Sequence, residues 1–374
     1  MQTDVRMLSL NVLASTALKK SYQFRGSADP APPAQDEADD YRGSLQTVLE
    51  NIMLLLMIPY KFLANPVMPK KWRRIGQAGA SFQRFISKML DDETQALSEG
   101  KSGSGGLLTG CAQALEVHKQ EEAVGTPMKE KKGLSAAEIC GNLFVTNFAG
   151  HDATFNTLSF TILLLIAHPE IQEWVAEEVV AVTGGKPAQE WDYKALYPRL
   201  KRCRAVLLET LRIYPSFPIV PKVSSSEVQT LKVGEQTLVI PPNTNISASI
   251  ITLQSHPAYW TDPMSWKPER WIVNQGASAD RFANEELWTP DRLIYVPWSD
   301  GPMSCLGRKA AEVELTGAVA CLLARNRLAA QPEFSGESDK EIRARVGHVV
   351  KDTGFEMLLA MKNADSVRVV CREA

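Results

Sequence analysis

One long helical segment places the strongest constraint on the fold. The chain from Ser135 to His168 contains no proline, and its second half includes the apolar run Phe160–Ala167. Ser135 and Glu138 have the spacing of a capping box, in which the two side chains satisfy backbone donors at a helix start. Pro169 ends the segment, because proline cannot continue a helix without breaking it. The apolar half predicts a buried central helix.

The rest of the pattern is also mainly helical. Residues 223–251 alternate in the manner of short strands, with turns at Val233-Gly-Glu and at Pro241-Pro-Asn, which predicts a small sheet. A hairpin-like region is expected over 346–370. We therefore expect a mainly α fold with small β-sheets, and the length of 374 residues allows one large core or two smaller ones. Helices are predicted over 1–24, 45–58, 72–97, 170–183, 199–214 and 306–325.

Two stretches are predicted to be flexible surface loops. Residues 26–43 mix Pro, Ala and acidic residues, a composition that buries too little apolar area to order itself. Residues 98–133 begin with a Gly- and Ser-rich segment and end in a charged one.

Composition excludes several classes of protein. With 44% hydrophobic and 22% charged residues, the chain is neither disordered nor fibrous. A net charge of −2 and a pI near 6.3 provide no overall field that would attract nucleic acid, so no nucleic-acid partner is predicted. The six cysteines form no CxxC pair, which favours reduced thiols. No apolar run is long enough to cross a bilayer, so no anchor is predicted in this chain.

One cysteine lies in an unusual setting. Cys305 follows a glycine-containing turn in the segment PWSDGPMSCLG, residues 297–307, directly ahead of an apolar helical pattern. A thiolate near a helix N-terminus is favoured in its anionic form. Gly301 and Gly307 would let the backbone lie close under a flat macrocycle. Cys305 could equally be a buried structural cysteine, since free cysteine is among the most buried residue types.

A second motif pairs opposite charges on one helix face. Glu209 and Arg212 are three residues apart, and their neighbours are apolar, which predicts a buried pair that needs a further partner. Arg270, in the segment WKPERW, could supply a planar guanidinium to the same carboxylate. In isolation, a pair of this kind usually lies on a solvated surface.

A third motif interrupts the long apolar helix with the segment AGHDAT, residues 149–154. Gly150 costs about 1 kcal/mol in a helix relative to alanine, which suggests that another group approaches the backbone closely. Asp152 and Thr154 are polar where burial would favour aliphatic residues. The alternative is a glycine packing notch beside solvent-facing polar side chains.

These motifs, in this order and at these separations, resemble the cytochrome P450 family, in the style of its fungal microsomal members. The resemblance covers essentially the whole chain but begins at what looks like the family's fifth helix. It implies a single cytochrome P450-like heme-binding domain over 1–374, with a fold that lacks the N-terminal helices and strands. Heme is the implied cofactor and Cys305 the implied iron ligand. It also implies the site residues Trp298, Gly301, Gly307, Gly150, Glu209, Arg212 and Arg270 around the cofactor, and Asp152 and Thr154 as proton-relay residues.

The implied activity is that of a heme-thiolate monooxygenase, which inserts one oxygen atom of O2 into a lipophilic small molecule, in specialised metabolism. A cysteine thiolate suits this chemistry because it donates electron density to iron and favours O–O cleavage. Apolar residues expected to contact the substrate are Phe148, Ala149, Ala153, Phe217, Ile219, Val220 and Phe355, although they could equally be core residues.

The implied partner is NADPH-cytochrome P450 reductase, for which Lys201, Arg202, Arg204, Arg308 and Lys309 could form a docking patch. The same charges could instead be ordinary solvated positions on helices. Full-length proteins of this type lie at the cytosolic face of the endoplasmic reticulum membrane.

The sequence departs from the family pattern at two site positions. Ala153 stands where the family's acid is normally followed by an alcohol, and Met303 stands where many members carry a basic residue that faces a heme propionate. Ala153, together with the N-terminal part of the family's fold that the resemblance does not cover, leaves two alternatives open. One is a non-catalytic remnant that binds heme weakly, and the other is a heme-thiolate isomerase or dehydratase.

Overall fold

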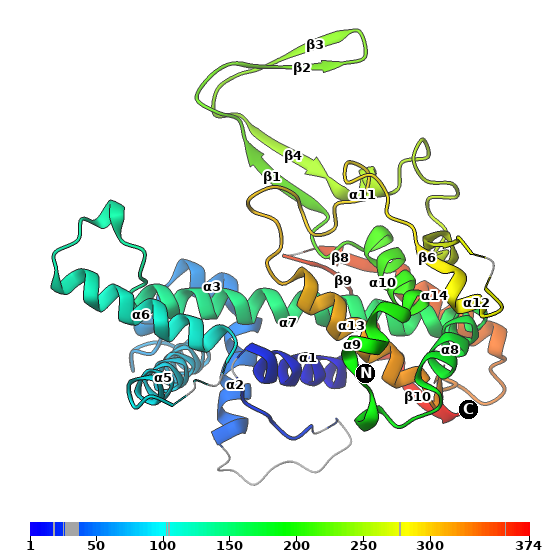
Figure 1. The fold of residues 1–374 in the computed structure, drawn as a ribbon, viewed down its shortest axis with the longest axis horizontal. Helices are drawn as coiled ribbons and strands as arrows, with labels where there is room; N and C mark the ends of the chain where they lie inside the picture. The colour runs from blue at the N-terminus through cyan, green and yellow to red at the C-terminus, as the bar shows by residue number, and fades with distance from the viewer. Residues whose placement is uncertain are drawn as a thin grey trace. The chain divides into compact units, whose positions relative to one another are not determined.

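The computed structural model describes residues 1–17, 19–24, 26, 37–101, 103, 105–276, 278–355 and 357–374. The chain forms two compact units (Figure 1). The N-terminal unit consists of Thr3–Asp152, and the C-terminal unit consists of Met1–Gln2 together with Ala153–Ala374.

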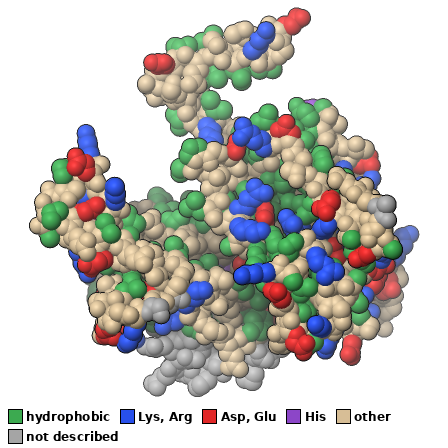
Figure 2. Space-filling view, in the orientation of Figure 1, with side chains coloured by type: hydrophobic (Ala, Val, Ile, Leu, Met, Phe, Trp, Pro, Cys, Tyr) green, Lys and Arg blue, Asp and Glu red, His purple; other side chains and the backbone are tan. Residues whose placement is uncertain are grey.

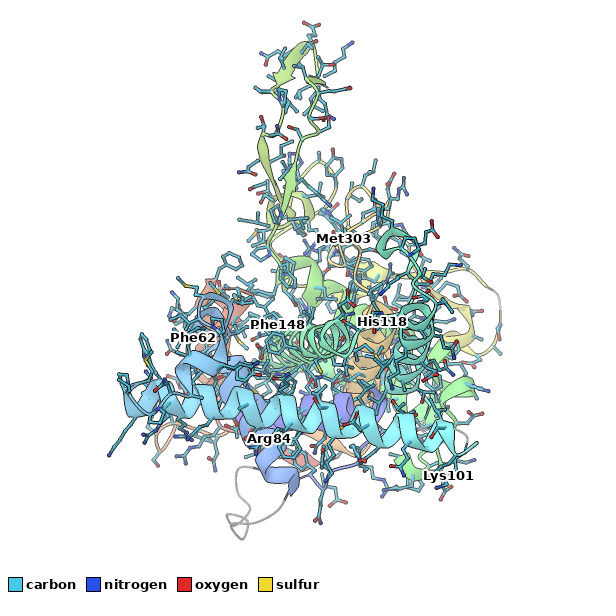
Figure 3. All side chains as sticks on the ribbon, turned by 90° about the vertical axis from the view of Figure 1, so that its left-hand side faces the viewer. Phe62, Arg84, Lys101, His118, Phe148 and Met303 are labelled. Atoms are coloured by element: carbon cyan, nitrogen blue, oxygen red, sulfur yellow. The ribbon has the colours of Figure 1, made fainter. Side chains whose placement is uncertain are left out.

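The N-terminal unit is helical in its described residues. Its core is built around α5, whose buried side chains recur at helical spacing, as at Ile75, Phe82, Ile86 and Leu90. Figure 3 shows α5 across the view, with Arg84 on it and Lys101 just beyond its end. The helices are α1 (Gln2–Ala17), α2 (Glu37–Glu50), α3 (Ile52–Met57), α4 (Tyr60–Leu63), α5 (Lys70–Ser98), α6 (Leu107–Ala123), η1 (Met128–Glu130) and the first half of α7 (Ala136–Ala167).

Two predictions of loops were wrong in part. Residues 27–36 of the expected loop 26–43 lie outside the described residues, but α2 begins at Glu37, earlier than its composition suggested. Tyr41 and Leu45 of α2 are buried, so tertiary packing outweighs the polar start of this helix. The other expected loop, 98–133, contains α6, which buries Leu108 and Leu115 two turns apart on one face.

The C-terminal unit combines helices with small sheets, which confirms the predicted fold class. Its helices are the second half of α7, α8 (Pro169–Thr183), η2 (Ala188–Glu190), α9 (Tyr193–Leu196), η3 (Tyr197–Arg199), α10 (Lys201–Ile213), α11 (Ile250–Gln254), η4 (Pro268–Trp271), α12 (Arg281–Asn284), α13 (Arg308–Leu323), α14 (Asp339–Lys351) and η5 (Ala364–Ser366).

The described strands form five two-stranded antiparallel sheets. The β2–β3 hairpin turns at Gly234, whose φ of +59° suits glycine. Figure 2 shows hydrophobic and charged side chains together on this hairpin. The pairs are β1 (Ile219–Val223) with β4 (Asn245–Ser249), β2 (Gln229–Val233) with β3 (Gln236–Ile240), β5 (Ile272–Asn274) with β6 (Glu285–Leu287), β7 (Asn326–Ala330) with β10 (Val369–Glu373), and β8 (Thr353–Phe355) with β9 (Leu359–Met361).

The predicted hairpin over 346–370 is shorter than expected. Its first residues continue α14, which starts at the capping box of Ser338 and Glu341 and ends at Lys351. The hairpin itself is β8–β9, and β10 pairs with β7 instead.

The second half of α7 is the buried core helix that the sequence predicts. Residues Phe155–Ile166 are buried throughout. This helix also makes a polar contact with α10, since the Thr161 hydroxyl lies 3.5 Å from the Thr210 hydroxyl. Among the described residues, no helix is long and apolar enough to cross a membrane.

A buried carboxyl group caps the start of α10. Glu178 of α8 accepts hydrogen bonds from the backbone N–H groups of Arg202 at 2.7 Å and of Cys203 at 3.1 Å. Burial raises the pKa of Glu178 to about 7, even though the two N–H donors and the Arg202 guanidinium favour the charged form. This carboxyl group therefore titrates near neutral pH in the folded protein.

We expect the E178Q variant to remove a pH-dependent part of stability. Because folding raises the pKa of Glu178 from 4.5 to about 7, its stabilising contribution is fully present below pH 4.5 and is lost as the pH rises through 7. The difference in free energy of unfolding, wild type minus E178Q, should fall by about 3 kcal/mol over this range. Urea unfolding of both proteins at pH 5, 6, 7 and 8 measures it. A difference that does not vary with pH would contradict the expectation.

Candidate active site

The carboxylate of Glu209 is the centre of a buried cluster of charges. Arg212 donates to it twice, from Nε at 2.8 Å and from Nη2 at 2.9 Å, and both side chains are 0% exposed. Arg270 donates from Nε at 3.0 Å. The geometry predicted for these three residues is confirmed.

Further donors and acceptors complete this cluster. The Trp271 indole and the Lys267 backbone N–H each donate to Glu209 at 2.9 Å. The remaining N–H groups of Arg212 reach backbone carbonyls, including that of Pro263 at 2.7 Å. Every charge is thereby hydrogen-bonded, which is the condition under which a buried ion pair is tolerated. Trp271 belongs to the motif that contains Arg270, but its role as a donor was not predicted.

Gln254 connects the charged cluster to the loop that carries Cys305. Its backbone carbonyl accepts from Arg212 at 2.8 Å, and its Nε2 donates to the carbonyls of Leu211 at 3.0 Å and Arg212 at 3.1 Å. Its Oε1 accepts from the backbone N–H of Val296 at 2.9 Å. The side chain is fully buried. Sequence reasoning missed this residue, because a lone glutamine in a short helix carries no motif.

The loop that precedes Cys305 closes on itself. The Cys305 N–H donates to the Trp298 carbonyl at 2.9 Å, and the Ser304 N–H donates to the Gly301 carbonyl at 3.0 Å. Ser299 and Gly301 have positive φ angles of 60° and 82°. Only Gly301 adopts such a conformation at little cost, which explains the glycine at this turn. Trp298 and Cys305 are therefore neighbours at the base of the loop.

The thiol of Cys305 lies at the start of α13 and is exposed. A Cβ atom added to Gly307, the N-cap residue of α13, would lie 3.9 Å from Cys305 Sγ. The sulfur is therefore close to a helix N-terminus, where the helix dipole favours a negative charge. All residues from Asp300 to Ala310 are exposed, including the apolar side chains of Met303 and Leu306.

These features fit a heme held by Cys305. The sulfur is accessible, glycines on both sides leave room beside it, and exposed apolar side chains adjoin it. The described residues contain no group of three or more His, Cys, Asp or Glu that could hold a metal ion. A single protein thiolate would be sufficient to hold heme iron, because the porphyrin supplies nitrogen ligands of its own. Met303, however, offers no positive charge to a propionate.

The three predicted site residues of the AGHDAT segment of α7, namely Gly150, Asp152 and Thr154, lie in different settings. His151 Nδ1 lies 3.0 Å from Asp152 Oδ1, with the Asp152 side chain 20% exposed. Thr154 is buried. At Gly150, an added Cβ would lie 3.1 Å from Leu13 of α1, so helix packing accounts for this glycine without a cofactor.

Three apolar side chains predicted to contact substrate are exposed in the C-terminal unit. They are Phe217 at 45%, Ile219 at 43% and Phe355 at 51%. Two of them are brought together by backbone pairing, because the Leu359 N–H donates to the Ser216 carbonyl at 2.9 Å and Leu359 pairs with Phe355. Such exposure favours contact with a ligand over a role in the core.

The other residues predicted to contact the substrate are less exposed or are not brought together by backbone pairing. Phe148 packs against the core of the N-terminal unit, which favours a core role for it. Ala153 and Val220 are half-buried, and Ala149 is exposed.

The basic residues at the starts of α10 and α13 divide into two groups. Lys201 and Arg202 pair with Glu286 and with Glu285, and Arg202 is buried. These two are therefore structural cations and unsuitable for a docking patch. Arg204 and Lys309 instead lie over the ring of Tyr197, at 5.1 and 4.1 Å from its centroid. Arg308 pairs with Glu312 on the exposed surface.

Comparisons with known proteins show which family the chain resembles. A sequence model of the family described as "Cytochrome P450" matches residues 1–356. The "Cytochrome P450 monooxygenase 124" of Postia placenta is 28% identical over 82% of this chain. The "Phomenoic acid biosynthesis cluster cytochrome P450 monooxygenase" of Leptosphaeria maculans is 27% identical over 80% of it.

The chain spans little more than half of the length of these two relatives, 54% and 52%. Among solved structures, the heme domain of cytochrome P450DA superposes with a TM-score of 0.68 at 19% identity. The match covers all of this chain and 68% of that domain, and it shows the same fold.

We expect the E209Q variant to be strongly destabilised. Removal of the negative charge would leave Arg212 buried without a counter-charge, which typically costs about 3 to 5 kcal/mol. Urea unfolding measures the loss. The control is D262N, because Asp262 forms an exposed ion pair with Lys267 and its substitution should cost little stability. Equal losses in the two variants would show that the buried cluster contributes no more than a surface ion pair.

Proposed function

Because the chain belongs to the cytochrome P450 family, whose members bind heme through a cysteine thiolate, we propose that it is a monooxygenase. It would insert one oxygen atom of O2 into a lipophilic small molecule. The observation that carries this proposal is the exposed Cys305 thiol at the start of α13, in a loop that Gln254 ties to the buried Glu209 cluster.

We assign the residues that hold heme by their positions in the C-terminal unit. Cys305 is the iron ligand, and Gly301 and Gly307 keep the adjoining backbone free of side chains. When bound, heme supplies the activation of O2, assisted by electron density from the thiolate. The cluster of Glu209, Arg212 and Arg270 acts at a distance, because it holds the segments on which the cysteine loop rests.

Proton delivery is proposed for two residues of α7. The carboxylate of Asp152 is partly exposed and can exchange protons with water, whereas Thr154 offers a buried hydroxyl. Residues two apart on a helix point about 200° from one another, so the pair does not form a direct relay. Ala153 occupies the position between them. We therefore propose that Asp152 and Thr154 do not exchange a proton directly and that water connects them.

The proposed substrate is lipophilic because the exposed side chains of Phe217, Ile219 and Phe355 offer apolar contacts. A role in specialised metabolism is supported by a relative whose name places it in a phomenoic acid biosynthesis cluster.

The proposed electron donor is NADPH-cytochrome P450 reductase. Arg204, Arg308 and Lys309 supply positive charge on α10 and at the start of α13, the helix that follows Cys305. Surface charge of one sign attracts an acidic partner and speeds encounter.

The proposed location is the cytosolic face of the endoplasmic reticulum membrane. The N-terminal unit exposes the apolar side chains of Met57, Phe62 and Val67, and Lys70 and Lys71 follow shortly after in the chain. Figure 3 shows Phe62 on α4. Exposed apolar side chains beside basic ones suit the surface of an anionic membrane.

A second candidate function is a heme-thiolate isomerase or dehydratase. It is favoured by Ala153 and by the angular separation of Asp152 and Thr154, since such reactions do not require proton delivery to O2. Product formation that continues without NADPH and O2 would identify it.

We expect the heme-loaded full chain to show the Soret band of a thiolate-ligated ferrous carbon monoxide complex. The C305S variant should lose this band, because serine does not supply the thiolate sulfur. The C321S variant is the control, since Cys321 is also exposed and lies on α13. A wild-type protein that binds heme without this band, or that does not bind heme, would contradict the proposed function and support a non-catalytic remnant.

A further inference from the structure

Position 153 of α7 carries no hydroxyl group, but the next turn of the helix brings one back to it. The Thr157 hydroxyl donates to the Ala153 carbonyl at 2.9 Å. This follows from helix geometry, because helical side chains point toward the helix N-terminus. At about 100° per residue, Thr157 lies about 40° around the helix from position 153, whereas Thr154 lies about 100° away. Thr157 is therefore better placed than Thr154 to act in place of a side chain at 153.

A second hydroxyl group adjoins that of Thr157. Ser216 Oγ lies 3.4 Å from Thr157 Oγ1, and both side chains are buried in the C-terminal unit. Because the single hydroxyl proton of Thr157 is directed to the Ala153 carbonyl, Ser216 is the donor in this long contact. Ser216 directly precedes Phe217, one of the exposed apolar side chains expected to contact the substrate. The pair of hydroxyl groups thus lies beside the segment proposed to bind substrate.

The segment that carries Ser216 is fixed on both sides. The Tyr214 ring stacks on Phe160 of α7, with ring centroids 4.4 Å apart. The Ser216 carbonyl accepts from the Leu359 N–H at 2.9 Å. These contacts hold the segment against α7 without using the Ser216 hydroxyl, which stays available to Thr157.

A threonine in a helix can bond to the carbonyl four residues before it without any further role. Thr161, one turn further along α7, shows this arrangement, since its hydroxyl donates to the Thr157 carbonyl at 2.8 Å. Its hydroxyl also lies 3.5 Å from that of Thr210 of α10, and its side chain is fully buried. Thr161 therefore provides a matched control for a purely structural hydroxyl.

We propose that the Thr157 hydroxyl takes the part of the alcohol that position 153 lacks, with Ser216 as its positioning partner. This inference rests on the proposed heme-thiolate function. In the heme-bound protein, Thr157 would donate a hydrogen bond to a small ligand on the face of the heme opposite Cys305. The hydroxyl proton turns by rotation about one bond, and the Ala153 carbonyl keeps the Thr157 N–H as its helical partner. Donation from Ser216 would polarise the Thr157 hydroxyl and strengthen it as a donor.

The test uses the full chain loaded with heme, reduced and bound to carbon monoxide. A hydrogen bond to this ligand weakens the C–O bond, so the T157V variant, which loses the donor, should raise the C–O stretching frequency in infrared spectra. T157S should keep the wild-type frequency, and S216A should give a smaller rise. The double variant A153T/T157V should return the frequency toward the wild-type value, because it places an alcohol at position 153. T161V, the control, should leave the frequency unchanged.

Several results would overturn the inference in a wild type that shows the thiolate Soret band. An unchanged frequency in T157V, or an equal rise in T161V, would assign Thr157 to helix structure alone. A frequency in A153T/T157V that stays at the T157V value would show that Thr157 does not stand in for an alcohol at 153. An unchanged frequency in S216A would remove the part assigned to Ser216. A wild type without that Soret band would instead overturn the proposed function.

Discussion

The carboxylate of Glu209 is the interaction on which the C-terminal unit depends. Charges and dipoles from Arg212, Arg270 and Trp271 converge on it, away from water. These donors come from α10 and from η4, about sixty residues further along the chain, so one carboxylate fixes two segments that share no regular sheet. Through Gln254, the same network reaches the cysteine loop. Hydrogen bonds of one buried side chain thus connect the charged cluster to the segment that leads to the thiol.

The sequence predicted the structure best where a chemical requirement, such as capping or charge pairing, coincided with helical spacing. The capping box at Ser135 predicted the start of α7, and hydrogen bonds in both directions between Ser135 and Glu138 confirm it. The apolar neighbours of Glu209 and Arg212 correctly predicted a buried pair with a third partner. Such residues were predictable because a buried charge is costly unless it is paired, so an apolar setting implies a partner.

Other features were not predictable because tertiary contacts decide them. α2 starts in an acidic stretch that composition assigns to a loop, and α6 lies between polar segments. Gln254 bonds to groups over forty residues away in both directions, which no local pattern records. The basic residues 201 and 202 looked equivalent to those at 204 and 309, yet acidic partners from β6 occupy the first two. Whether such a basic residue is paired depends on which acidic residues, distant in sequence, pack against it in the fold.

The β2–β3 hairpin, in contrast to the charged cluster, has no buried residue in either strand. Every residue of both strands is exposed or nearly so, and its backbone ladder is held without a covering layer. Two-stranded ribbons of this kind are only marginally stable in water. The hairpin therefore opens and closes locally while the charged cluster stays intact, and its amide hydrogens exchange with solvent long before those of α7 or α10. Rigidity in this chain is therefore graded, from the buried residues of α7 and α10 to this exposed hairpin.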